Sequence, residues 1–135
     1  MSAKRKILIV EDDPGLRQVH DIFFNYEGFD LSALTNGLDA ITRIRENTYD
    51  IVVLDLGLPD IDGLDVLKQV REFSNVPIIV MTARTDIHSI KQCYALGAND
   101  YINKPFRPEI LLRRIEAILK APDARKSVDA VGSIQ

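Results

Sequence analysis

Acidic, hydroxyl and amino side chains follow short apolar runs of this 135-residue chain, at the point where each run ends. Glu11 and Asp12 follow "ILIV", Asp55 ends "IVVLD", Thr82 follows "PIIVM" and Lys104 follows "YIN". Clustered carboxylates raise each other's pKa unless a cation joins them, and oxygen ligands suit a hard cation such as Mg²⁺. A carboxylate, a metal, a hydroxyl and an ammonium around one point are suited to phosphoryl transfer.

These groups meet only if the runs that carry them are neighbouring strands. Residues 6–10, 51–54 and 77–81 are continuous apolar runs rich in β-branched residues, which is typical of parallel strands covered on both faces. Residues 29–33 and 100–103 are weaker strand candidates. The site of an open α/β sheet forms at the carboxyl ends of its strands, so we expect the groups above to converge on one edge.

Amphipathic patterns with helical spacing separate the strands. They cover residues 15–27, 37–46, 64–73, 85–96 and 108–120. In the first of them the spacing predicts a buried face made of Leu16, Val19, Ile22, Phe23 and Tyr26. Strict alternation of strands and helices predicts an α/β fold, with a doubly wound parallel sheet of five strands and five helices on its two faces.

The composition is that of an ordinary globular domain. Hydrophobic residues make up 46% and charged residues 27%, and the net charge of -3 gives no sign of a nucleic-acid or membrane surface. The apolar runs are too short to span a bilayer, and a single cysteine, Cys93, fits a reducing compartment, so we expect a cytoplasmic protein. Residues 1–120 are assigned to one domain, and residues 121–135, polar and aperiodic, to a tail or the start of a linker.

Four segments resemble the receiver domain of bacterial response regulators: "ILIVEDD", "VVLDLGLPDIDGLDVL", "VPIIVMTAR" and "GANDYINKPF". Their motifs are most similar to the subfamily of winged-helix transcription factors. The resemblance implies a flavodoxin-like strand order of 2-1-3-4-5 and a role in two-component phosphorelay signalling. The donor would be a cognate sensor histidine kinase, a phosphotransfer protein or a small phosphodonor. Such a domain is not a turnover enzyme, because it catalyses only its own phosphorylation and slow dephosphorylation.

The resemblance also implies a role for each site residue. Asp55 matches the phosphoacceptor, Asp12 a direct Mg²⁺ ligand and Glu11 an acid that acts largely through water. Gly57 would offer its backbone carbonyl to the metal, for which Mn²⁺ is an alternative. Thr82 would bind a phosphoryl oxygen.

Lys104 would contact the phosphoryl group and, before it arrives, the acceptor carboxylate. The family's Lys-Pro bond is cis, which makes Lys104-Pro105 a candidate. Thr82 and Tyr101 match the family's switch pair, which remodels the surface of the fourth helix, fifth strand and fifth helix. On this output surface, as we name it, we expect Ile90, Lys91, Asp100, Ile110 and Arg114.

Homodimerisation or partner binding would use the output surface. Asp100 and Arg114 fit a cross-dimer ion pair of the subfamily, whereas Ile90 and Ile110 replace charged residues and predict a more apolar contact. The winged-helix domain is absent from residues 121–135, so we expect no direct nucleic-acid binding and no membrane contact by this chain. It is either a stand-alone receiver or a fragment of a longer regulator.

Two alternatives remain open from the sequence. The first is a phosphatase that forms an aspartyl phosphate. Haloacid-dehalogenase-like enzymes of that kind carry a general acid and base two residues after the nucleophile, where this chain has Gly57, which cannot move a proton. The second is a receiver-like scaffold that works without phosphorylation. In the family, positions 57 and 84 tune dephosphorylation, but Gly57 and Arg84 do not reveal the direction.

Overall fold

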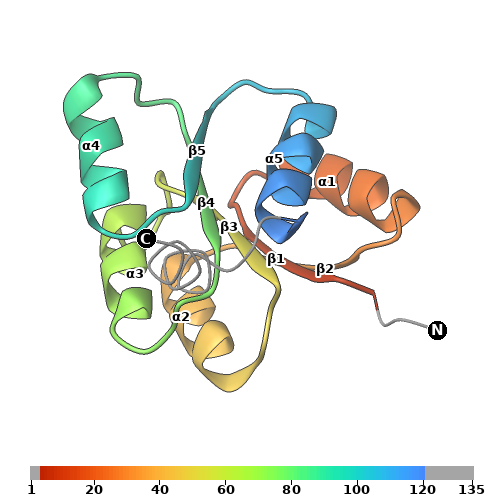
Figure 1. Ribbon diagram of the computed structural model, residues 1–135, viewed down its shortest axis with the longest axis horizontal. Coiled ribbons are helices and arrows are strands. Elements are labelled where there is room, and N and C mark those ends of the chain that lie inside the picture. Colours follow the sequence, from red (N-terminus) through yellow and green to blue (C-terminus); the bar gives the residue numbers. More distant parts are fainter. Residues whose placement is uncertain (1–3, 121–135) are drawn as a thin grey trace, which may run out of the picture.

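The computed structural model describes residues 4–120, which form five strands alternating with five helices (Figure 1). The strands are β1 (Lys6–Val10), β2 (Asp30–Leu34), β3 (Ile51–Asp55), β4 (Ile78–Thr82) and β5 (Asp100–Asn103). The helices are α1 (Pro14–Tyr26), α2 (Gly37–Glu46), α3 (Gly63–Arg71), α4 (Ile87–Ala95) and α5 (Pro108–Lys120). The predicted tail, residues 121–135, lies outside the described residues.

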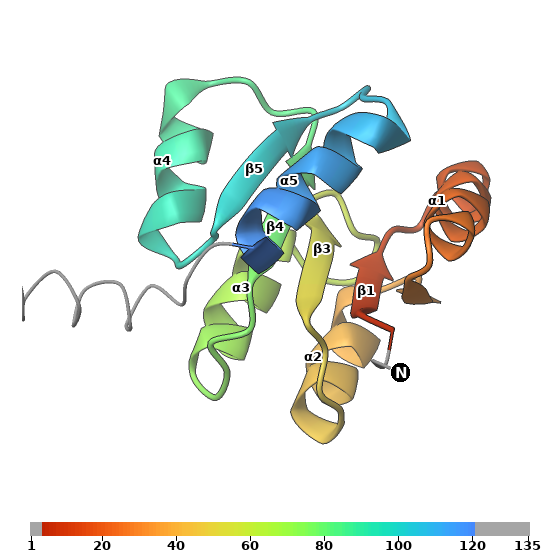
Figure 2. The ribbon, with the colours of Figure 1, turned by 45° about the vertical axis from the view of Figure 1, so that its right-hand side comes forward.

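All five strands are parallel and lie in the order β2-β1-β3-β4-β5, which confirms the expected topology. In the central strand, Val53 pairs with Ile9 of β1 and with Ile79 of β4. Every residue of β3 and β4 is buried. The arrowheads of β1, β3 and β5 point to the same edge of the sheet (Figure 2), so the residues that follow these strands come together there.

Helices cover both faces of the sheet, with α1 and α5 on one face and α2, α3 and α4 on the other (Figure 1). Successive strand residues point to opposite faces. Leu8 and Val10 therefore pack with α2 and α3, whereas Ile7 and Ile9 pack with α1 and α5. This double coverage explains why the strands read as continuous apolar runs.

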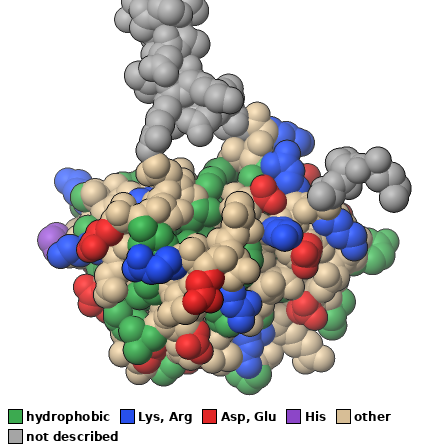
Figure 3. Space-filling model, turned by 90° about the horizontal axis from the view of Figure 1, so that it is seen from below, with side chains coloured by type: hydrophobic (Ala, Val, Ile, Leu, Met, Phe, Trp, Pro, Cys, Tyr) green, Lys and Arg blue, Asp and Glu red, His purple; other side chains and the backbone are tan. Residues whose placement is uncertain are grey.

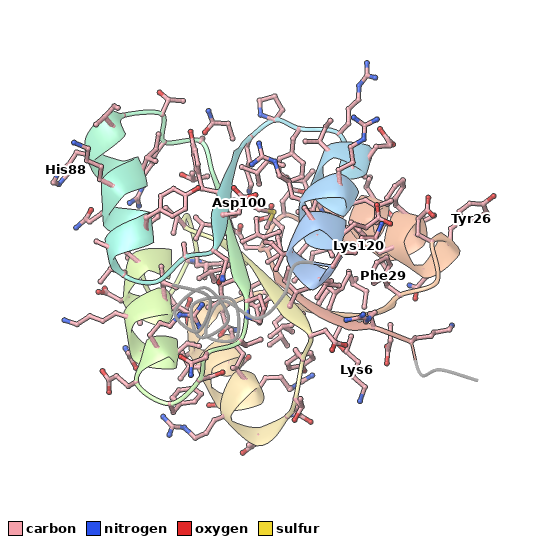
Figure 4. All side chains as sticks on the ribbon, viewed as in Figure 1. Lys6, Tyr26, Phe29, His88, Asp100 and Lys120 are labelled. Carbon is pink, nitrogen blue, oxygen red and sulfur yellow. The ribbon has the colours of Figure 1, made fainter. Side chains whose placement is uncertain are left out.

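The buried face of α1 differs from the prediction. Val19, Ile22 and Tyr26 are 47%, 63% and 87% exposed, and Tyr26 points away from the molecule (Figure 4). The residues that α1 buries are instead His20 and Phe24. Apolar residues lie on several sides of this helix, so their spacing alone predicted the wrong rotation.

Aromatic packing determines the rotation of α1. The ring of Phe24 lies 5.1 Å from Phe23 and 5.8 Å from Phe29, edge to face in both cases. His20 stacks on Phe106, with ring centroids 5.8 Å apart. Such pairs are worth about 0.5–1.5 kcal/mol beyond their buried area, so the contacts of α1 with Phe29 and Phe106 favour the observed rotation.

Most other boundaries agree with the predicted ones within two residues. The helix expected from residue 85 begins at Ile87, because the side chain of Asp86 accepts a hydrogen bond from the amide of Ser89 and caps it. The helix expected to reach Phe73 ends at Arg71. At its other end, a Cβ on Gly63 would lie 2.6 Å from the carbonyl oxygen of Asp55, so glycine allows α3 to approach the end of β3.

Candidate functional site

The carboxyl edge of the sheet holds a cavity of about 620 Å³. Its wall brings together every group that the sequence placed at the strand ends. The lining residues are Glu11, Asp12, Asp13, Pro14, Asp55, Gly57, Thr82, Ala83, Arg84 and Lys104. The expected convergence of three acids, a hydroxyl and an ammonium is therefore present.

Lys104 joins two acids at the centre of the cavity. Its Nζ donates to Oε1 of Glu11 at 2.6 Å and to Oδ2 of Asp55 at 2.7 Å. The other oxygen of Asp55, Oδ1, accepts a hydrogen bond from the amide of Gly57 at 3.0 Å. Asp55 is only 5% exposed, and both of its oxygens have partners. The peptide bond between Lys104 and Pro105 is cis, as expected.

Burial and hydrogen bonds separate the pKa values of the two acids. Burial raises the pKa of Glu11 to about 7, and its hydrogen bond with Asp55 acts in the same direction. Burial alone would also raise the pKa of Asp55, but hydrogen bonds from Glu11, Lys104 and Gly57 outweigh it and lower that pKa. The pKa of Lys104 is raised, because its bonds to Asp55 and Glu11 outweigh burial. Near neutral pH, Asp55 and Lys104 are therefore ionised, whereas the pKa of Glu11 lies close to that pH.

Three carboxylates form a cluster that could hold a metal ion. Glu11, Asp12 and Asp55 each offer one oxygen, and these three atoms lie within 4.8 Å of one another. Burial raises the pKa of Glu11, and a cation bound beside it would act in the opposite direction. Asp13 serves the helix instead, since its Oδ1 accepts hydrogen bonds from the amides of Gly15 and Leu16. The donor set therefore fits a hard, oxygen-preferring cation.

The two switch candidates, Thr82 and Tyr101, take no part in the side-chain hydrogen bonds of Lys104. Thr82 is buried, and its hydroxyl oxygen accepts a hydrogen bond from the amide of Arg84 at 2.9 Å. Ala83 is exposed on the cavity wall. Tyr101 is half-buried and packs against the core beneath α2, α3 and α4. Both switch side chains thus have defined partners within the domain.

Two contacts at the site were not predictable from motif spacing. Nη2 of Arg84 lies 3.4 Å from Oδ2 of Asp62, a residue 22 positions earlier in the chain. Nη1 of Arg17 donates to the backbone carbonyl of Glu11 at 2.9 Å. Neither pair lies at a spacing that a strand or helix pattern would indicate, so the sequence carries no signal for them.

The residues expected on the output surface differ in their exposure and in their contacts within the chain. Nη1 of Arg114 donates to both carboxylate oxygens of Asp100, at 2.8 and 2.9 Å, within the same chain. Asp100, labelled in Figure 4, is the first residue of β5. Ile110 is 37% exposed, and Ile90 is half-buried. Lys91 is exposed on α4.

Charge elsewhere on the surface is mixed. On the face shown in Figure 3, acidic and basic side chains are interspersed. Within residues 4–120, no helix is both long and apolar enough to cross a membrane.

Known proteins are similar in sequence to most of the region that the structure describes. A family model described as "Response regulator receiver domain" matches residues 7–116. The DNA-binding response regulator MtrA of Mycolicibacterium smegmatis is 41% identical over 117 residues, which are 87% of this chain and 51% of that protein. The response regulator ArlR of Staphylococcus saprophyticus is 38% identical over 129 residues, 96% of this chain and 59% of that protein. The chain thus spans little more than half the length of these relatives.

Solved structures agree with this match. A two-component response regulator from Clostridium difficile superposes with a TM-score of 0.83 at 33% identity, covering 87% of this chain and 97% of that one. A CheY-like receiver domain protein from Methanospirillum hungatei has the same TM-score at 24% identity, covering 87% of this chain and 94% of that one. At that lower identity, the likeness shows the fold alone.

Proposed function

This chain belongs to the response regulator receiver domain family, and from that premise we propose that it is switched by a phosphoryl group accepted on Asp55. The observation that carries the proposal is the position of Asp55. It is a buried, ionised carboxylate at the end of the central strand, facing a cavity that a lysine and three further acids also line. A cognate sensor histidine kinase, a phosphotransfer protein or a small phosphodonor would supply the group in the cytoplasm.

In the proposed reaction an Asp55 oxygen forms a bond to phosphorus, while the bond between phosphorus and the donor's leaving atom breaks. The leaving group keeps the electron pair of that bond. Lys104 already contacts Asp55 and would turn to the phosphoryl oxygens, and the Thr82 hydroxyl would bind one of them. Glu11, Asp12, Asp55 and the carbonyl of Gly57 would hold Mg²⁺, or alternatively Mn²⁺. When bound, this ion supplies positive charge that neutralises the phosphoryl oxygens.

Gly57 favours a switch over a phosphatase. It lies two residues after Asp55 and lines the cavity, but it has no side chain that could activate a water molecule. Without a base at that position, hydrolysis of the Asp55 phosphate should be slow, as a signal requires.

The output surface on α4, β5 and α5 would transmit the signal. We propose that Thr82 and Tyr101 shift on phosphorylation and open this surface to a second copy or to a partner protein. We assign the receiver domain to residues 1–120 and the start of a linker to residues 121–135. The relative named DNA-binding response regulator MtrA suggests a DNA-binding output in a longer protein, whereas this part of it would not contact nucleic acid itself.

Mass spectrometry of the intact protein tests the proposal. With Mg²⁺ and acetyl phosphate, the wild-type chain should gain one phosphoryl group, and chelation of the metal should prevent the gain. Asp55→Asn should gain none. Asp50→Asn, just before the amino end of the same strand, is the matched control and should react like the wild type. Failure of the wild type to react, or equal reaction of Asp55→Asn, would refute the proposal.

A further inference from the structure

Arg84 is a second cation on the cavity wall. Among the described residues that line the cavity, only Lys104 and Arg84 carry positive charge. The Lys104 ammonium is already shared between Glu11 and Asp55. Arg84, in contrast, has a partly exposed side chain with one weak partner, Asp62, at 3.4 Å. It is therefore the cation most readily available to an incoming anion.

The backbone of Arg84 is fixed while its side chain can move. Its amide donates to Oγ1 of Thr82 at 2.9 Å, which holds the residue beside the end of β4. Arg84 lines both the central cavity and a smaller hollow formed by the loop between β3 and α3, which Asp62 also lines. Rotation of the Arg84 side chain would therefore move its guanidinium from the smaller hollow into the central cavity without moving the backbone.

Asp62 has a separate structural task. Its Oδ1 accepts a hydrogen bond from the amide of Leu64 at 2.9 Å and so caps α3, while Oδ2 faces Arg84. Loss of the Arg84 contact would therefore leave the helix cap in place. Both side chains are partly exposed, and ion pairs of that kind are weak and easily exchanged.

We propose that Asp62 restrains Arg84 in the unphosphorylated protein, and that a phosphoryl donor displaces Asp62 to take the guanidinium. The inference rests on the function proposed above and extends it to a named autoinhibitory contact. A donor brings about two negative charges into the cavity. A guanidinium binds phosphoryl oxygens through two parallel N–H groups, which a single contact at 3.4 Å to one carboxylate oxygen does not match.

A double-mutant cycle on the rate of phosphorylation by acetyl phosphate tests the exchange. Asp62→Asn keeps a capping oxygen but removes the charge that holds Arg84, so its rate should rise about 1.4- to 5-fold, the range expected for an exposed ion pair. Arg84→Ala should slow the rate, and Arg84→Lys should restore part of it. In the Arg84→Ala background, Asp62→Asn should have no effect.

Two further measurements separate this exchange from a general effect of charge or folding. Arg113→Ala removes an exposed arginine of α5 that does not line the cavity, and it should leave the rate unchanged. The gain in Asp62→Asn should shrink as salt rises, whereas its thermal stability should match that of the wild type.

The outcomes distinguish this inference from the proposed function. If the wild type takes up no phosphoryl group, the proposed function is refuted. If the wild type reacts but Asp62→Asn accelerates equally with and without Arg84, or Arg84→Ala reacts as fast as the wild type, only the Arg84 exchange is overturned.

Discussion

At the scale of single residues, the site depends on one lysine whose ammonium group forms hydrogen bonds to two buried acids. Lys104 contacts both Glu11 and Asp55, yet the pKa of Glu11 is raised while that of Asp55 is lowered. Buried ion pairs add little to stability, because desolvation offsets their attraction. The contacts among Lys104, Glu11 and Asp55 are better understood by their effect on charge: they keep Asp55 ionised, while the pKa of Glu11 is raised toward neutral pH.

The raised pKa of Glu11 predicts that Mg²⁺ binding depends on pH. A proton on Glu11 competes with the cation, so affinity should rise about tenfold from about pH 6 to about pH 8, with release of a proton. Calorimetric titrations in two buffers of different ionisation enthalpy measure both quantities. Glu11→Gln should bind more weakly and lose the dependence. Equal affinity at both pH values would show that Glu11 is not the competing group.

At the scale of elements, α1 shows how tertiary contacts override a periodic pattern. Its rotation buries His20, which is 1% exposed and whose Nδ1 has no hydrogen-bond partner among residues 4–120. A buried, unpaired polar atom costs about 1–3 kcal/mol. The stacking of His20 on Phe106 holds α1 against the segment that follows Lys104 and Pro105, so this helix supports one wall of the site.

Replacement of His20 by leucine should therefore stabilise the domain. Burial lowers the pKa of His20 below 6.5, so below that pH the unfolded chain binds more protons than the folded one, and stability falls as the solution becomes acidic. In urea unfolding, His20→Leu should gain about 1 kcal/mol near neutral pH, and its advantage should widen at about pH 5.5.

The matched control is His88→Leu, the same substitution at an exposed position of α4 (Figure 4). Its difference from the wild type should stay small and should not widen on acidification. A loss of stability in His20→Leu at both pH values would mean that the imidazole packs better than an aliphatic side chain.

At the scale of the whole molecule, three exposed large apolar residues lie on the helices that flank β5, and three others lie on α1. Ile87 and Tyr94 of α4 and Ile110 of α5 are all exposed. The charged pair expected to cross a dimer interface, Asp100 and Arg114, is closed within the chain. Self-association through this surface would therefore depend more on apolar contact than on ion pairs.

We predict that the phosphorylated chain self-associates and that Ile110→Glu weakens this at least about tenfold, because the contact would then bury an unpaired carboxylate. Sedimentation equilibrium measures the association, which should persist at high salt. Ile22→Glu places the same charge at an exposed isoleucine of α1 and should have no effect. A monomer in both phosphorylation states would contradict the prediction.

The sequence by itself determined most of the fold and the chemical groups of the candidate site. Continuous apolar runs alternating with amphipathic ones specify parallel strands covered by helices, and such strands end at one edge. The residues that follow them, including Glu11, Asp55 and Lys104, must then meet, whatever the details of packing. This is why the cavity lining could be predicted from residues far apart in the chain.

Only the tertiary structure decided which face of α1 is buried, which partner Arg84 contacts and how Glu11 titrates. Each of these depends on distances between side chains of different elements, which no local period encodes. Asp62 and Arg84 belong to separate loops, and the pKa of Glu11 depends on how completely its neighbours exclude water. The strand order brings the groups together, and packing determines their charge.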